Sequence, residues 1–157
     1  MRTRRVYCDT SVFGGCFDVE FAEASNRLMD LVRQGAFQLV ISQVTLDELV
    51  KAPENVRELV DSLPGDRVET LEEDPEVSVL RDAYLAARVV GPSSRADAEH
   101  IASATIAGVD MIVSWNFRHI VHFRKIPLYN AVNALRGYPS LSILSPREVI
   151  EYEDEDV

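Results

Sequence analysis

The stretch RRVYCDTSVFGG, residues 4–15, places an aspartate at the point where a run of strand-forming residues ends. Residues 6–8 are typical of a short buried strand, and Ser11 with the glycines beyond it indicates a turn. Open α/β sheets bind their ligands beyond the carboxyl ends of the strands. Asp9 can therefore cap the next segment, pair with a cation or serve a site at that edge. Residues elsewhere in the chain are needed to choose among these three roles.

Strand and helix patterns alternate along the chain. Short apolar stretches predict strands at residues 5–8, 37–41, 67–71, 111–115 and 141–144. Apolar residues recur at helical spacing between them, over residues 21–32, 44–50, 53–63, 77–89 and 96–107. This alternation requires crossover connections. The sequence therefore predicts an α/β fold with a mostly parallel sheet of about five strands, covered by helices on both faces.

Length and composition indicate one domain with an acidic end. The chain has 157 residues, of which 46% are hydrophobic and 27% are charged, as in ordinary globular proteins. The net charge of −10 argues against a sequence-specific DNA-binding protein, but five of the carboxylates lie in residues 151–157. We expect a domain over residues 1–150 and an acidic, disordered tail over residues 151–157. A metal-dependent phosphodiesterase is compatible with this acidity, because metal ions offset clustered carboxylates.

The sequence shows no pattern of export or membrane insertion. No apolar run approaches the roughly 18 residues that a membrane span needs, and the apolar run before Asp9 is too short for the core of a signal peptide. The spacing of Cys8 and Cys16 matches no metal-binding motif, so we expect both to be reduced thiols. We expect a cytoplasmic protein without a membrane partner.

Four polar side chains fall where predicted strands end or where the following helices begin; they are Asp9, Glu48, Asp97 and Asn116. Carboxylates that face one another repel and raise one another's pKa unless a divalent cation lies between them. Mg²⁺ binds one or two carboxylates together with waters and phosphate oxygens. A pair of such ions, about 3.5–4 Å apart, can activate water and stabilise a leaving oxygen. One hypothesis, a negative pocket that binds Mg²⁺, thus accounts for all four positions.

Each of these residues also has a purely structural explanation. Asp9 can accept hydrogen bonds from the backbone just ahead of it. Glu48 follows Thr45 at the spacing of a capping box, and Asp97 follows Ser94 in the same way. The asparagine after the fourth strand can simply turn the chain. Taken one at a time, none of the four decides between structure and function.

Taken together, these motifs resemble the PIN domain (PilT N-terminus) family of ribonucleases, best known from the VapC toxins. The similarity lies in DTSVFGG (9–15), the glutamate at position 48, ADAEHIASA (96–104) and IVSWNFRHI (112–120), and it covers residues 5 to about 146. It implies a three-layer α/β/α sandwich, Mg²⁺- or Mn²⁺-dependent cleavage of RNA, and a homodimer. The metal-binding catalytic carboxylates would be Asp9, Glu48 and Asp97. The family often has an aspartate where this chain has Asn116, and an amide would hold a second ion less tightly.

A further set of side chains is expected to contact substrate: Thr10, Ser11, His100, Arg118, His119, Arg124 and Lys125. The two hydroxyls can bind a phosphate oxygen, hold the carboxylate beside them or cap a turn. His100 lies one helical turn after Asp97 and can line the site, act as a general acid, or pack between helix and sheet. The basic stretch at residues 118–125 can bind the phosphates of a single strand or form the solvated face of a short helix.

We therefore predict a metal-dependent endoribonuclease, the toxin of a toxin–antitoxin pair, whose antitoxin peptide could fill the groove. The alternative is a non-catalytic module of the same fold that binds RNA or protein through a weakened metal site. A phosphatase with Asp9 as nucleophile is disfavoured, because Ser11 stands where such a motif has its second aspartate. Leu128, Tyr129, Val132 and Leu135 have the spacing of either a dimer face or ordinary core.

Overall fold

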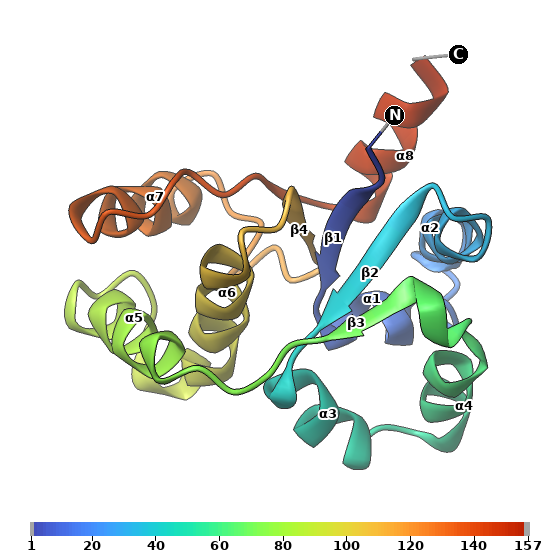
Figure 1. Ribbon diagram of the computed structural model, residues 1–157, viewed down its shortest axis with the longest axis horizontal. Coiled ribbons are helices and arrows are strands. Elements are labelled where there is room, and N and C mark those ends of the chain that lie inside the picture. Colours follow the sequence, from blue (N-terminus) through green and yellow to red (C-terminus); the bar gives the residue numbers. More distant parts are fainter. Residues whose placement is uncertain (1, 156–157) are drawn as a thin grey trace.

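The computed structural model describes residues 2–155, and this part of the chain contains one sheet of five parallel strands in the order β3-β2-β1-β4-β5 (Figure 1). The strands are β1 (Arg4–Cys8), β2 (Phe37–Ile41), β3 (Val68–Thr70), β4 (Met111–Val113) and β5 (Ile143–Leu144). The helices are α1 (Thr10–Gly15), α2 (Ala22–Arg33), α3 (Gln43–Val50), α4 (Glu54–Ser62), α5 (Pro75–Ala86), α6 (Arg95–Ala107), α7 (Lys125–Leu135) and α8 (Pro146–Glu155), with short 3-10 turns η1 (Gly65–Arg67) and η2 (Pro92–Ser94). All five predicted strands are present.

Helices cover both faces of the sheet, because successive strand side chains point to opposite sides. Cys8 and Val113 belong to a core cluster that includes buried residues of α1, α2, α4 and α8. Tyr7 and Ile112 belong to a second cluster, formed with α5, α6 and α7. Figure 1 shows these two groups of helices on opposite sides of the sheet. The prediction of a three-layer α/β/α sandwich is confirmed.

The central strand β1 brings Asp9 to the carboxyl edge of the sheet. Cys8 pairs with Val113 of β4, and the backbone N–H of Asp9 donates to the carbonyl of Val113 at 3.3 Å. Asp9 and Ser114 therefore leave the sheet next to each other. On the other side of β1, β2 ends at Ile41 and α3 begins directly after it. Because the strands are parallel, all three chain segments emerge at the same edge.

A tightly packed tryptophan holds the segment after β4 in place. The Trp115 ring stacks on Phe21 with a centroid distance of 4.2 Å, and its Nε1 donates to Ser25 Oγ at 2.7 Å. A Cβ atom added to Gly15 would lie 2.7 Å from Trp115 Nε1, whereas one added to Gly14 would meet nothing within 4 Å. Gly15 is therefore required for a close approach, by a packed side chain of the protein itself.

Part of the segment expected to be a disordered tail, residues 151–157, is helical. Residues 146–155 form helix α8, and residues 156 and 157 lie outside the described part of the chain. The helix begins at a capping box in which the Ser145 N–H donates to Glu148 Oε1 at 3.0 Å and the Glu148 N–H donates to Ser145 Oγ at 3.3 Å. Val149 packs into the core, and Arg4 pairs with Glu153 at 3.4 Å. These contacts order the segment despite its charge.

The two cysteines are separate thiols. Cys8 and Cys16 are both free and buried, as expected for small apolar side chains in a core. Among residues 2–155, no helix combines the length and the apolar character needed to cross a bilayer.

Candidate metal centre

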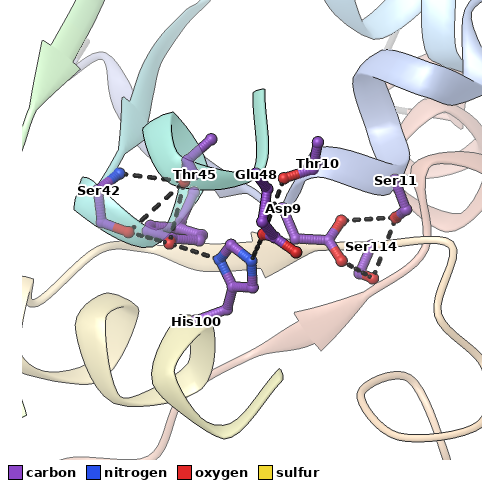
Figure 2. A network of polar contacts seen from close by, with 9 residues as sticks. Asp9, Thr10, Ser11, Ser42, Thr45, Glu48, His100 and Ser114 are labelled. Carbon is purple, nitrogen blue, oxygen red and sulfur yellow. Dashed lines mark hydrogen bonds and ion pairs between the residues drawn. The ribbon is translucent and has the colours of Figure 1, made fainter. Parts of the chain in front are cut away.

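Asp9 is nearly fully buried, with 4% of its surface exposed. Its Oδ1 accepts a hydrogen bond from Ser11 Oγ at 2.6 Å, and its Oδ2 accepts one from Ser114 Oγ at 2.8 Å (Figure 2). The side chain makes no capping bond to α1, although Asp9 occupies the N-cap position. Burial raises the pKa of Asp9, and the charge of Glu48 adds to this, while His100 and the two hydroxyls oppose it. A nearby cation would stabilise its ionised form.

Glu48 reaches the same region from α3. Its Oε1 accepts hydrogen bonds from Thr10 Oγ1 at 2.9 Å and from His100 Nε2 at 2.5 Å. Its Oε2 accepts none from the residues that the structure describes. The capping box of α3 is formed by Ser42 and Thr45, so the capping role considered for Glu48 is not observed. Burial alone would raise the pKa of Glu48, but the bonds to His100 and Thr10 and the charge of His100 lower it.

His100 is buried between α6 and the sheet, with 1% of its surface exposed. Its Nδ1 shares a hydrogen bond of 2.7 Å with the Tyr7 hydroxyl, and its Nε2 bonds to Glu48 (Figure 2). Burial alone would lower the pKa of His100, but Tyr7, Glu48 and the charge of Asp9 raise it to about 10. The contact with Glu48 therefore favours the protonated form of the ring. With 1% of its surface exposed, His100 packs between helix and sheet, which is the structural alternative considered from the sequence.

Asp97 stands in the first turn of α6, half-buried, and its N-cap serine makes no side-chain capping bond. Burial raises the pKa of Asp97, and the charge of Glu48 raises it further. The charges of His100 and His119 and a hydrogen bond with the Asn116 side chain lower it. Asp97 therefore shares its electrostatic environment with Glu48.

Asn116 turns the chain after β4. Its Oδ1 accepts hydrogen bonds from the backbone N–H of Arg118 at 3.2 Å and of His119 at 2.9 Å. Its side chain also lies close enough to Asp97 to lower the pKa of that carboxyl group. The amide oxygen is already used by the turn. This geometry does not support the role of an oxygen ligand for Asn116.

The three acids come from three elements and influence one another. Glu48 raises the pKa of both Asp9 and Asp97. Within residues 2–155, no three His, Cys, Asp or Glu side chains are grouped closely enough to enclose a metal ion. Mg²⁺ needs only one or two carboxylates, because waters and phosphate oxygens complete its shell. The buried carboxyl group of Asp9, the half-buried one of Asp97 and the free Oε2 of Glu48 are oxygen donors of the kind that Mg²⁺ or Mn²⁺ binds.

The two hydroxyl residues after Asp9 hold the carboxylates. Ser11 donates to Asp9 and its Oγ accepts from the Trp115 N–H at 2.9 Å, while Thr10 donates to Glu48. Of the roles considered from the sequence, the structure favours support of the acids over contact with a phosphate.

The basic stretch after Asn116 forms turns as far as Arg124, and Lys125 begins helix α7. Arg118 and Arg124 are exposed and make no ion pair with any described residue, and the Arg124 guanidinium lies 5.6 Å from the Phe123 ring centroid. Lys125 donates to the carbonyl of Val89 at 2.8 Å, a structural role. His119 lies near Asp97, and its buried Nδ1 has no hydrogen-bond partner within residues 2–155. Within the described part of this stretch, Arg118 and Arg124 are the exposed cations that could contact an anionic ligand.

Sequence reasoning missed Ser114 and Tyr7. Ser114 is a fully buried polar residue directly after an apolar strand, and that position was a usable signal. Tyr7 lies in the middle of a buried strand, where its hydroxyl must find a partner; it bonds to Ser42 Oγ at 2.6 Å as well as to His100. Which partner it would find depends on the fold.

A pocket of about 600 Å³ lies beside this site, between α3, α5 and α6. Its acidic lining residues are Asp47, Glu72, Glu73, Asp74 and Glu99. None of the three candidate ligands lines it. The pocket is therefore distinct from the region where the buried carboxyl groups meet.

The sheet is all-parallel, helices cover both of its faces, and acidic side chains lie at the carboxyl edge of its central strands. These features define a three-layer α/β protein with an acidic site. Residues 5–118, well over half of the chain, match the PIN domain. The chain therefore belongs to the PIN domain family, as the resemblance of its motifs indicated.

One solved structure shares the fold at low sequence identity. It is "Crystal structure of VapBC2 from Rickettsia felis bound to a DNA fragment from their promoter", with a TM-score of 0.54 and 13% identity over 78% of this chain and 93% of that chain. At this identity the likeness concerns the fold. No curated protein matches the sequence.

Proposed function

We propose that this PIN domain protein is an endoribonuclease that depends on Mg²⁺ or Mn²⁺. The observation that supports the proposal is that Glu48 raises the pKa of both Asp9 and Asp97, although the three acids are far apart in the sequence. Carboxyl groups that raise one another's pKa are costly to ionise together unless a cation compensates their charge. In a chain of the PIN domain family, this coupling supports a metal site for phosphodiester hydrolysis.

The chain's residues have distinct tasks in this proposal. Asp9, Glu48 and Asp97 would hold the metal, which when bound would activate water and stabilise the charge that develops on the phosphate. Ser11 and Ser114 fix the orientation of Asp9 through its two oxygens. The role of Asn116 would be to keep Asp97 in place.

The substrate would approach over the turns after Asn116. Arg118 and Arg124 carry free positive charge there, and Phe123, which is 76% exposed, offers a ring on which a base could stack. A basic and aromatic segment beside an acidic site is suited to a single-stranded RNA whose phosphates lie on the arginines. This arrangement supports RNA as the substrate in a chain of net charge −10.

The partners would be an antitoxin and a second copy of the chain. The VapBC2 structure contains a protein pair on promoter DNA, and this supports an antitoxin whose peptide covers the acidic site. A homodimer has α7 as its candidate face, because Leu128 and Leu135 are exposed there while Tyr129 and Val132 belong to the core. The cytoplasm is the expected location of such a pair.

The proposal is tested by cleavage of a fluorophore-quencher single-stranded RNA at millimolar Mn²⁺. The wild type should cleave, and Asp9→Asn should lower the rate by about 100-fold or more, because a metal site contributes several kcal/mol to the transition state. Asp110→Asn is the matched control, since Asp110 lies at the opposite edge of the sheet. Undiminished cleavage by Asp9→Asn, or in excess chelator, would contradict the proposal.

A second candidate is a non-catalytic PIN module that binds RNA or protein. The observation that favours it is the engaged oxygen of Asn116 together with the lack of a closed three-ligand group among residues 2–155. A protein that binds single-stranded RNA without cleaving it, and that shows no Mn²⁺ binding at millimolar concentration, would establish this alternative.

A further inference from the structure

We propose that Tyr7 and His100 are positioning residues for Glu48, which together fix its carboxylate so that Oε2 is the oxygen available to a divalent cation. This inference rests on the proposed function. It gives the buried side chains of Tyr7 and His100 a role in metal binding, although neither of them is a metal ligand.

The first observation is an unbroken chain of hydrogen bonds. The Tyr7 hydroxyl bonds to His100 Nδ1 at 2.7 Å, and His100 Nε2 bonds to Glu48 Oε1 at 2.5 Å (Figure 2). Each ring nitrogen has a partner, so a flip of the ring would break both bonds. The ring also packs edge-on against Tyr7, with 5.7 Å between centroids. Its orientation is thus fixed by polar and apolar contacts together.

The second observation is that both bonds to Glu48 use the same oxygen. Thr10 Oγ1 and His100 Nε2 both donate to Oε1, whereas Oε2 accepts no hydrogen bond from residues 2–155. The two hydrogen bonds to Oε1 fix the orientation of the carboxylate, and they leave Oε2 as the oxygen available to a ligand. A metal would therefore meet Glu48 as a monodentate ligand.

The third observation is that the chain of bonds ends on rigid elements. Tyr7 is fully buried at the centre of β1, and its hydroxyl also bonds to Ser42 Oγ, at the N-cap of α3. Glu48 stands on that same helix, yet its side chain is 37% exposed. A long, partly exposed carboxylate has many rotamers, and fixing one of them before the metal binds lowers the entropic cost of binding.

The two amide substitutions of His100 separate positioning from packing. The amide nitrogen of glutamine can take the place of Nε2 and keep the bond to Glu48, whereas that of asparagine reaches only the place of Nδ1. By calorimetric titration with Mn²⁺, His100→Gln should stay within about threefold of the wild type. His100→Asn should bind Mn²⁺ about 10-fold to 100-fold more weakly, the usual effect of losing a partner of a metal ligand. Circular dichroism and thermal melting show whether each variant is folded.

Tyr7→Phe tests the outer member of the pair, with Tyr84→Phe as its control. Tyr84 is also fully buried, and its hydroxyl bonds to Asn133 Oδ1 at 2.5 Å in the second core cluster. Both variants should lose thermal stability, but only Tyr7→Phe should weaken Mn²⁺ binding, by about 10-fold. In the His100→Asn background, Tyr7→Phe should have no further effect, because the pair acts as one unit.

Thr10→Val provides a variant that disturbs the core less, since Thr10 is only partly buried and donates to the same oxygen. It should weaken Mn²⁺ binding about threefold or more. The inference is overturned if His100→Gln and His100→Asn bind Mn²⁺ equally well, or if Tyr7→Phe and Thr10→Val bind it like the wild type. A wild type that binds no Mn²⁺ overturns the proposed function and this inference with it.

Discussion

At the scale of single residues, Asp9 and Asp110 lie at opposite ends of the same sheet in opposite environments. Burial raises the pKa of Asp9. Burial alone would also raise the pKa of Asp110, but the Arg5 N–H, at 2.8 Å, and the Arg2 guanidinium, at 2.6 Å, lower it. The folded protein therefore disfavours the ionised form of Asp9 and stabilises the ionised form of Asp110. The position of Asp110 away from the site agrees with the sequence, in which a whole strand separates it from Asn116.

Asp9→Asn should make the protein more stable at neutral pH. The folded-state pKa of Asp9 lies above its unfolded value of about 3.9. Its contribution to stability is therefore full below that value and is lost as the pH rises through the folded pKa. Removing the charge should raise the free energy of unfolding by about 1 kcal/mol at pH 7, or the melting temperature by about 3 °C. Chemical denaturation at pH 7 and at pH 3.5 measures the gain, which should shrink at the lower pH.

Asp110→Asn should make the protein less stable at neutral pH, the opposite of the effect of Asp9→Asn. The folded-state pKa of Asp110 is lowered, so its contribution is present above its unfolded value and is lost as the pH falls through the folded pKa. We expect a loss of about 1 kcal/mol at pH 7, mostly from the hydrogen bond to the Arg5 backbone, because the Arg2 pair is exposed to solvent. Asp9→Asn and Asp110→Asn changing stability in the same direction would contradict this account.

Residue chemistry indicated three candidate acids but not the side chains that hold them. Asp9, Glu48 and Asp97 could be named because strand ends and helix starts are visible in the sequence. The partners of these acids could not: Ser114 meets Asp9 only through the pairing of β1 with β4. Asn116 was expected to assist the metal, and only the coordinates show its oxygen taken up by a backbone turn.

At the scale of elements, α1 positions the site by packing against the segment after β4. Gly15→Ala should destabilise the protein by about 1–3 kcal/mol, because its Cβ would lie 2.6 Å from Ser25 Oγ and 2.7 Å from Trp115 Nε1. Gly14→Ala, one residue earlier in the same helix, should be neutral or stabilising. The fluorescence of Trp115, the single tryptophan, reports unfolding in urea for both variants. Equal stability of the two would show that the contact is not tight.

Helices and strands were predicted correctly where buried apolar residues dominate the sequence pattern. The strand at residues 37–41 has the predicted bounds, and β4 ends two residues earlier than predicted, where the Ser114 hydroxyl bonds to Asp9 and the Trp115 ring bonds to Ser25 of α2. Helix α1 was read as a turn, because its two glycines are typical of turns. The second half of helix α8 was expected to be a tail, because residues 151–155 are rich in carboxylates and the capping box lies several residues before them, at Ser145.

At the scale of the whole molecule, the parallel sheet is what brings distant acids together. Cys8 and Ile41 end neighbouring strands, and α6 lies on the face that carries Tyr7, so Glu48 comes close enough to residues 9 and 97 to raise the pKa of both. The fold class could be predicted from alternating patterns. The bridging role of His100 could not, because it depends on the distances among β1, α3 and α6.

The most direct measurement of the central claim is the anomalous difference density of a crystal soaked in Mn²⁺. The account predicts a peak among the carboxylates of Asp9, Glu48 and Asp97, with Oε2 as the oxygen that Glu48 contributes. The same soak of Asp9→Asn should leave that position without density. A wild-type crystal that shows no peak there at millimolar Mn²⁺, or that binds the ion only at the acidic pocket beside α5, would contradict the account.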